Sequence, residues 1–176
     1  TNPKHQAILF TFYSTGLRMN ELINLKPLDI ESDRKLIRVN EGKGKKDRYV
    51  LLSPLLLKIL RFYWKTYWSG SKQKPVYLFP GSDLKKPISR KGAWWIIKKA
   101  GKKAGIPLEK VSPHKIRHAF STHLLESGVN IRIIQELLGH RSLRTTAIYT
   151  HVATNHLHTI ETPLDVLYKE KRKEEN

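Results

Sequence analysis

The feature that most constrains the fold is a series of helix-start and helix-stop signals along the chain. Serine–proline pairs at 53–54 and 112–113 combine a good N-cap with a residue suited to the first helical turn. Gly105 and Gly139 follow apolar patterns of helical period and suit helix C-termini. Together the signals predict helices over residues 3–15, 17–25, 54–68, 90–104, 113–127, 131–138 and 142–150.

Two short apolar segments, "KLIRVN" and "RYVLL", read as strands on either side of the Gly- and Lys-rich "EGKGKKD", which suits a hairpin. The fold class is therefore expected to be mainly α with a small antiparallel β-sheet. No repeat and no long internal linker divides the chain, so residues 1–168 are expected to form one domain. The charged run 169–176 is expected to be a disordered or partly helical tail.

The charge balance points to a polyanionic partner. The chain has 33 Lys and Arg against 15 Asp and Glu, a net charge of +18 that is spread over most of its length. Nucleic acid suits this charge better than a membrane surface, because the sequence has no long basic amphipathic helix and no apolar run near the ~18 residues of a membrane span. Packing within a ribonucleoprotein would produce the same charge.

The chain contains no cysteine. A disulfide framework, a thiolate nucleophile and the common cysteine-based zinc sites are thereby excluded, and a reducing cytoplasm is compatible with this composition. The sequence begins "TNPKHQAILF", without an initiator Met or a signal-peptide pattern, and we expect it to be a fragment of a longer protein.

The stretch "SPHKIRHAF" crowds cations into the start of a predicted helix. On an ideal helix His114, Arg117 and Ser121 share one face, and an apolar stripe lies beside it. The unpaired N–H groups of the first turn favour an anion near His114. A basic helix face with a half-buried histidine is the structural alternative. The members of the apolar stripe are Ile116, Phe120 and Leu124.

Two further side chains follow in "LLGHRS" and "TTAIYTH". His140 is the first residue after the predicted helix end at Gly139, where a short loop can aim it into a cleft. Tyr149 lies on the next predicted helix. Taken singly, each is compatible with a structural role.

Two other kinds of site also match this region. His114 and His118 have the spacing of a helical zinc pair, but Lys115 occupies the place of the usual metalloprotease glutamate and Arg117 would repel the metal cation. The segment "STHLLESGVNIRIIQELL" resembles a helix-turn-helix, so a non-enzymatic DNA-binding module stays open.

Five motifs in order resemble the tyrosine recombinases, the family of phage integrases and Xer-type recombinases, which are similar in mechanism to type IB topoisomerases. They are "TGLRMNEL", "GKGKKDRYV", "HKIRHAFSTHLLESG", "IQELLGH" and "TTAIYTHV". They span nearly the whole chain, and the last three are highly specific in this order and spacing. The resemblance implies the fold of a tyrosine recombinase catalytic domain and site-specific DNA recombination, with a catalytic set of Arg18, Lys43, His114, Arg117, His140 and Tyr149.

The resemblance also implies a role for each catalytic residue. Arg18 and Arg117 would grip the scissile phosphate, because a planar guanidinium binds two phosphate oxygens at once. Tyr149 would attack phosphorus and form a 3′-phosphotyrosine, with no metal and no ATP cofactor. Lys43 would protonate the leaving 5′ oxygen, with Lys45 and Lys46 as local alternatives. The two histidines would share the phosphate hydrogen bond and the phenol proton.

Double-stranded DNA is the partner that this reading implies. The side chains expected to contact its backbone are Lys45, Lys46, Arg48, Arg90, Lys115, Arg141 and Arg144. Family members usually carry an N-terminal helical domain that helps to clamp DNA, and nothing before Thr1 supplies it. They assemble as dimers or tetramers on DNA, and residues 157–168 are expected to dock on a neighbouring subunit, unless they complete their own core. Among enzymes, a type IB topoisomerase is the alternative function.

Overall fold

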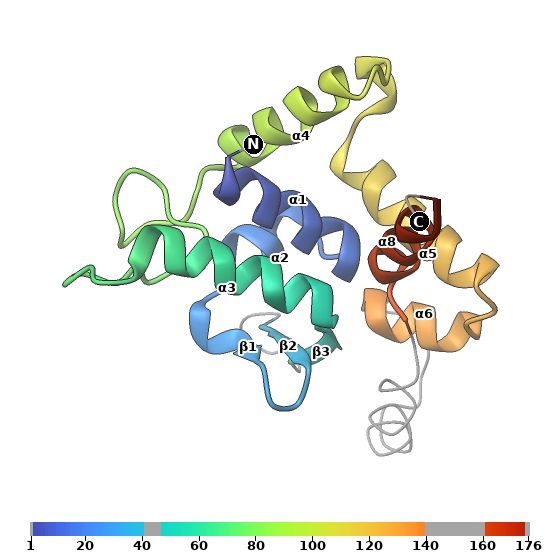
Figure 1. Ribbon diagram of the computed structural model, residues 1–176, viewed down its shortest axis with the longest axis horizontal. Helices are drawn as coiled ribbons and strands as arrows, with labels where there is room; N and C mark the ends of the chain where they lie inside the picture. The colour runs from blue at the N-terminus through green and yellow to red at the C-terminus, as the bar shows by residue number, and fades with distance from the viewer. Residues whose placement is uncertain (1, 41–46, 140–160, 175–176) are drawn as a thin grey trace.

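A central helix, α1 (Pro3–Thr15), lies between α3 and α4 in the computed structural model (Figure 1). The structure describes residues 2–40, 47–139 and 161–174. At the start of α1 the Asn2 side chain accepts the N–H groups of Lys4 and His5, and at its end Gly16 adopts a left-handed conformation with φ 60°. The helix predicted over residues 3–15 is confirmed.

Gly16 has a second reason to be a glycine. A Cβ atom built there would lie 2.4 Å from Cδ1 of Phe120, which is buried on α5. Any larger residue would therefore meet both a strained backbone and a ring in the core. This close approach ties the end of α1 to α5 (Pro113–Glu126) and so places the carbonyl of Gly16 next to that helix.

The short helix α2 (Met19–Asn24) and a 3-10 turn, η1 (Pro27–Asp29), lead into the sheet. Strands β1 (Ile30–Glu31), β2 (Leu36–Val39) and β3 (Arg48–Leu51) are antiparallel in the order β1-β2-β3, with Ile37 opposite Val50. The predicted hairpin strands are confirmed, and β1 is an addition that the sequence did not predict. The hairpin connection 41–46 lies outside the described residues.

Helices α3 (Pro54–Trp68) and α4 (Arg90–Lys103) begin where predicted, each at a serine N-cap. Ser53 accepts the N–H of Leu56 and Ser89 accepts the N–H of Gly92. The segment between them contributes Leu78 and Phe79 to the main core, and a second 3-10 turn, η2 (Leu108–Lys110), follows α4. Helices α3 and α4 both pack against α1.

Helices α5 and α6 (Ile131–Leu138) carry a second apolar cluster. Phe120 and Leu124 are 1% and 0% exposed, so the predicted apolar stripe of α5 is confirmed. Ser112 caps α5 by accepting the N–H of Lys115 at 3.2 Å, and Gly139 ends α6 with φ 64°. The helix predicted over residues 142–150 lies outside the described residues.

The last described helix, α8 (Pro163–Glu174), runs through residue 168, after which the sequence analysis expected a charged tail. The tail was expected to be disordered or partly helical, and residues 169–174 continue the helix. Leu164 in its first turn is 5% exposed, and α8 packs against α1, α3 and α5. Thr162 adds a hydrogen bond to the Asp165 carboxylate at 2.9 Å.

Together these results confirm the expected fold class, mainly helical with a small antiparallel sheet. Figure 1 shows the end of α1 close to α5 and α6 at one side of the fold.

Candidate active site

A cleft of about 1370 Å³ runs along α2, between the first turns of α4 and α5. Three of the residues predicted to be catalytic line it: Arg18, His114 and Arg117. They come from the start of α2 and from α5, which are far apart in the sequence. The fold thus brings together the arginines and the histidine that the motifs singled out.

Arg18 stands at the N-cap of α2, where its side chain is 44% exposed. Its Nη2 donates to the carbonyl oxygen of Gly139 at 3.0 Å, and its Nη1 donates to Glu21 at 2.8 Å. Gly139 is the residue directly before His140. The guanidinium therefore lies at the end of α6, against the backbone that leads into the predicted histidine loop.

Arg117 reaches the same place from α5. Its Nη1 donates to the carbonyl oxygen of Gly16 at 2.5 Å, and its Nη2 donates to the carbonyl oxygen of Leu138. Carbonyl groups at helix C-termini lack partners inside their helix and carry partial negative charge. The ends of α1 and α6 thus attract and orient both guanidinium groups, which bind the adjacent carbonyls of Leu138 and Gly139.

Glu21 is a site residue that the sequence reading did not identify. It accepts the backbone N–H of Arg18 at 2.7 Å and both Nη atoms of Arg48, at 3.0 and 2.8 Å. Its side chain is 11% exposed. The position of Glu21 three residues after the helix N-cap is the available signal, because a glutamate there commonly bonds back to the cap.

The ionisation of Glu21 depends on these arginines. Partial burial by itself raises the pKa of the carboxyl group, but hydrogen bonds from the Arg48 guanidinium and the Arg18 backbone outweigh it and lower the pKa to about 2. Glu21 is therefore a carboxylate at any physiological pH. It accepts a hydrogen bond from Nη1 of Arg18, while Gly139 accepts one from Nη2, and so helps to hold Arg18 at the cleft.

The substitution Glu21→Gln is expected to destabilise the chain by about 3 kcal/mol at pH 7. Because the folded-state pKa lies below the ordinary 4.5, this contribution is present above about pH 4.5 and is lost as the pH falls toward 2. Urea unfolding at pH 7 and at pH 3 measures it. Glu109→Gln, at an exposed position, is the control and should change stability by less than about 0.5 kcal/mol. A Glu21→Gln deficit of equal size at both pH values would contradict the assignment.

His114 lies in the first turn of α5, is exposed and faces the cleft. The predicted start of this helix is confirmed, with Ser112 as cap and Pro113 in the first turn. Both also line the cleft, so its wall includes a helix N-terminus beside the histidine. The proton-transfer role of His114 stays a prediction.

The predicted DNA contacts fall into different surroundings. Arg90 is exposed at the start of α4 and lines the cleft, whereas Lys115 is exposed on α5 outside the cleft lining. Arg48 is 11% exposed, pairs with Glu21 and donates from Nε to the Leu137 carbonyl at 3.2 Å. This position indicates that Arg48 supports the site from inside the fold, where a carboxylate holds its guanidinium.

The other predicted site residues lie outside the described residues, and their roles stay predictions. They are Lys43, Lys45, Lys46, His140, Arg141, Arg144 and Tyr149. Within residues 2–40, 47–139 and 161–174, no group of three His, Cys, Asp or Glu side chains is arranged to hold a metal ion. None of the helices described there is long and apolar enough to cross a membrane.

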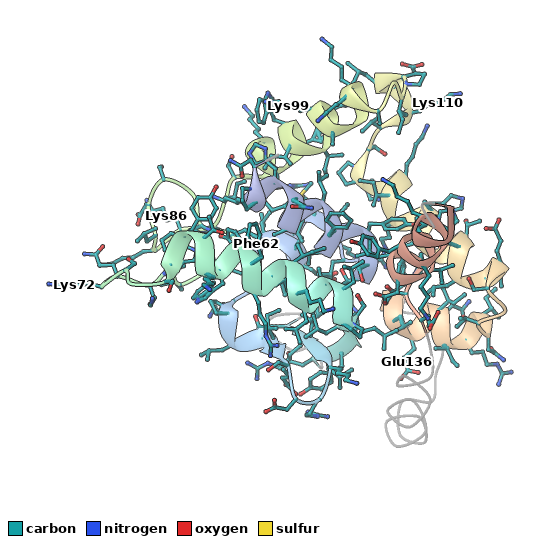
Figure 2. The ribbon with its side chains drawn as sticks, in the orientation of Figure 1. Phe62, Lys72, Lys86, Lys99, Lys110 and Glu136 are labelled. Atoms are coloured by element: carbon teal, nitrogen blue, oxygen red, sulfur yellow. The ribbon has the colours of Figure 1, made fainter. Side chains whose placement is uncertain are left out.

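The positive charge is distributed over the surface, as the sequence indicated. Figure 2 shows Lys72 past the end of α3, Lys86 in the segment that leads to α4, Lys99 on α4 and Lys110 beyond it, at separate points of the molecule. The cleft itself is lined by six Lys and Arg side chains and two acidic ones, Glu21 and Asp29. Each of the two acidic side chains is paired with an arginine. The cleft thus presents a positive surface.

Comparison with known proteins finds close relatives. The chain is 48% identical over 164 residues to the putative integrase/recombinase y4eF of Sinorhizobium fredii, covering 93% of this chain and 63% of that protein. It is 46% identical over 158 residues to the tyrosine recombinase XerA of Pyrococcus horikoshii, covering 89% of this chain and 53% of that protein. The chain therefore spans about half to two thirds of the length of these curated relatives.

Solved structures agree with this result. The crystal structure of XerA recombinase superposes with a TM-score of 0.70 at 33% identity, covering 97% of this chain and 59% of that one. XerH site-specific recombinase bound to its difH substrate, a pre-cleavage complex, superposes with a TM-score of 0.66 at 27% identity. This match covers 90% of this chain and 45% of that one. The phage integrase family model matches residues 2–156. The chain belongs to the phage integrase family.

Proposed function

We propose that this chain is the catalytic domain of a site-specific DNA recombinase, which cleaves and rejoins DNA through a 3′-phosphotyrosine. The observation that carries the proposal is the meeting of Arg18 and Arg117 at the end of α6, in a positive cleft that His114 also lines. Membership of the phage integrase family and relatives named as tyrosine recombinases support it.

The two arginines are placed to stabilise a reacting phosphodiester. A guanidinium carries up to five N–H donors in a rigid plane, so it can hold a backbone carbonyl at one edge and phosphate oxygens at another. Charge builds up on the non-bridging oxygens in the transition state, where fixed donors stabilise it most. Glu21 and the helix-end carbonyls hold both arginines before the substrate arrives.

The reaction uses residues of this chain for each transfer. The phenolic oxygen of Tyr149 forms a bond to phosphorus as the bond from phosphorus to the 5′ oxygen breaks, and the phenol proton passes to His114. Lys43 protonates the departing 5′ oxygen, and His140 donates a hydrogen bond to the phosphate. Attack by a 5′-hydroxyl on the phosphotyrosine reverses these steps and rejoins DNA, so neither ATP nor a metal ion takes part.

DNA binding follows from the charge and position of the cleft. Arg90 adds a cation to its wall, and Lys45, Lys46, Lys115, Arg141 and Arg144 are proposed to contact the DNA backbone. Structural relatives include recombinases solved with DNA, such as XerH bound to its difH substrate. The protein would act in the cytoplasm, on DNA.

A covalent trapping assay tests the proposal. Duplexes bound by the chain are first selected from a randomised pool, and a nicked version of the selected site then lets the 5′ fragment escape after cleavage. The chain should form a protein–DNA band that resists SDS, with or without EDTA. A helix-turn-helix module that only binds DNA would give no such band, and loss of the band in EDTA would point to metal-dependent cleavage. A type IB topoisomerase would instead relax supercoiled plasmid as a monomer, without paired sites.

The proposed assembly is a dimer or tetramer on DNA in which residues 157–168 dock on a neighbouring subunit. In the single chain, the described part of this segment packs on its own core through Leu164, while Leu167 and Tyr168 are 50% and 52% exposed. These two side chains are available to a neighbour without unfolding α8. The first turn of α8 would stay in place or exchange between subunits.

Leu167→Glu is therefore expected to leave folding and binding to a single half-site unchanged, but to lower the cooperativity of binding to paired half-sites about 5- to 150-fold. Gel-shift titrations on single and paired half-sites measure both quantities. Leu125→Glu, at a position on α5 that is 52% exposed, is the matched control. Unchanged cooperativity for Leu167→Glu would remove the support for docking through α8.

A further inference from the structure

The cleft continues past the catalytic end of α2 to a second group of polar side chains. A helix of six residues such as α2 spans about 9 Å, which separates this group from Arg18. The group comes from η1, from β2 with the residue after it, and from the segment that precedes α4. Its members are Lys26, Asp29, Arg38, Asn40 and Tyr77.

Arg38 is the residue of β2 that turns away from the core. Its neighbours Leu36, Ile37 and Val39 are buried, whereas the Arg38 side chain is 43% exposed and lines the cleft. Because side chains alternate across a strand, Arg38 lies on the face opposite to Ile37 and Val39, and it shares its face with Leu36, which packs in the second apolar cluster. The strand thus presents a cation at the cleft from a rigid element.

A buried carboxylate, that of Asp29, orients the Arg38 guanidinium through one of its N–H groups. Asp29 is 6% exposed, accepts the backbone N–H of Lys26 at 2.8 Å through Oδ2, and accepts Nη2 of Arg38 at 3.3 Å through Oδ1. Nε of Arg38 is buried and has no hydrogen-bond partner among the residues that the structure describes. Asp29 binds Nη2, so within the described residues Nη1 of the guanidinium can donate to a further acceptor.

We infer that Arg38, oriented by Asp29, binds a phosphodiester of the DNA backbone at a position away from the scissile phosphate. Lys26 and Tyr77 line the same end of the cleft and add a cation and a phenol there. The acceptor is an anion, because cations outnumber acids in the lining, and non-bridging phosphate oxygens match a guanidinium fork. The inference rests on the proposed function, in which DNA fills the cleft. Arg38 would be a positioning residue that holds the strand along α2.

The salt dependence of binding tests this contact. The probe is a duplex of about 30 base pairs, for which each phosphate contact contributes about 0.9 to the slope of log K against log salt concentration. Arg38→Gln should lower the slope by about 0.9. Arg34→Gln is the matched control: Arg34 carries the same charge beside the same sheet, pairs with Glu31 at 2.8 Å and does not line the cleft. Its slope should equal that of the unchanged chain.

A double variant shows whether a change of slope comes from lost DNA contact or from a folding defect caused by the unpaired Asp29 carboxylate. Asp29→Asn combined with Arg38→Gln leaves no unpaired buried charge and keeps the net charge at +18, so any loss of slope comes from the local contact. The slope of log K against log salt concentration should fall by the same amount, about 0.9, for this double variant. Urea unfolding should show that the variant is folded. An unchanged slope in both Arg38 variants, or an equal loss in Arg34→Gln, would overturn the inference. If the unchanged chain showed no salt-dependent binding at all, the proposed function would fail with it.

Discussion

Tyr149→Phe is expected to abolish the covalent protein–DNA adduct while binding persists. The substitution removes only the phenolic oxygen, which is the proposed nucleophile, and leaves the aromatic ring. Binding depends mainly on the many Lys and Arg side chains, which the variant keeps. Adduct formation is followed on the nicked substrate, and binding is followed on the intact duplex.

A matched tyrosine separates this result from a general effect of losing a hydroxyl group. Tyr67→Phe changes a tyrosine on α3 that is 40% exposed and outside the cleft lining, and it should form the adduct at the normal rate. If Tyr149→Phe still forms the adduct, another residue is the nucleophile and the reading of "TTAIYTHV" is wrong.

Arg18→Lys and Arg117→Lys should each slow cleavage about 10²- to 10³-fold, with a much smaller effect on DNA affinity. Lysine keeps the charge but loses the planar fork, so it cannot hold a helix-end carbonyl and the phosphate together. Single-turnover cleavage rates and gel-shift affinities give the two quantities for each variant. Arg34→Lys, outside the cleft, should cleave normally.

Arg117 also joins α1 to α6 through Gly16 and Leu138, so its variant can lose stability as well as rate. Rates are therefore compared well below the unfolding midpoint of each variant, which urea or thermal unfolding supplies. If a folded Arg18→Lys or Arg117→Lys chain cleaves at nearly the normal rate, that arginine has a structural role and the proposed clamp is incorrect.

The helices could be predicted closely because their ends carry local signals. Ser53, Ser112 and Gly139 act through hydrogen bonds and backbone conformation within a few residues, so the sequence around them decides the boundary. Strand β1 has two residues, too few to show an alternating pattern. The extent of α8 past residue 168 could not be predicted, because α8 packs against α1, α3 and α5, which lie far from it in the sequence.

The candidate site shows the same division between local and distant information. Motif spacing identified Arg18, His114 and Arg117, and the fold places all three at one cleft. It did not identify Glu21 or the pairing of Arg48, because a sequence shows a charge but not the partner that the fold brings to it. Arg48 was expected to meet a phosphate, whereas Glu21, from another element, holds it inside the fold.

The most direct test of the central claim is to identify the amino acid that carries the DNA after trapping. The SDS-resistant adduct is digested with trypsin and a nuclease, and mass spectrometry locates the residual nucleotide on the peptide. The account predicts a nucleotide joined through its 3′ phosphate to Tyr149. A nucleotide on any other residue, or one joined through a 5′ phosphate, would contradict it.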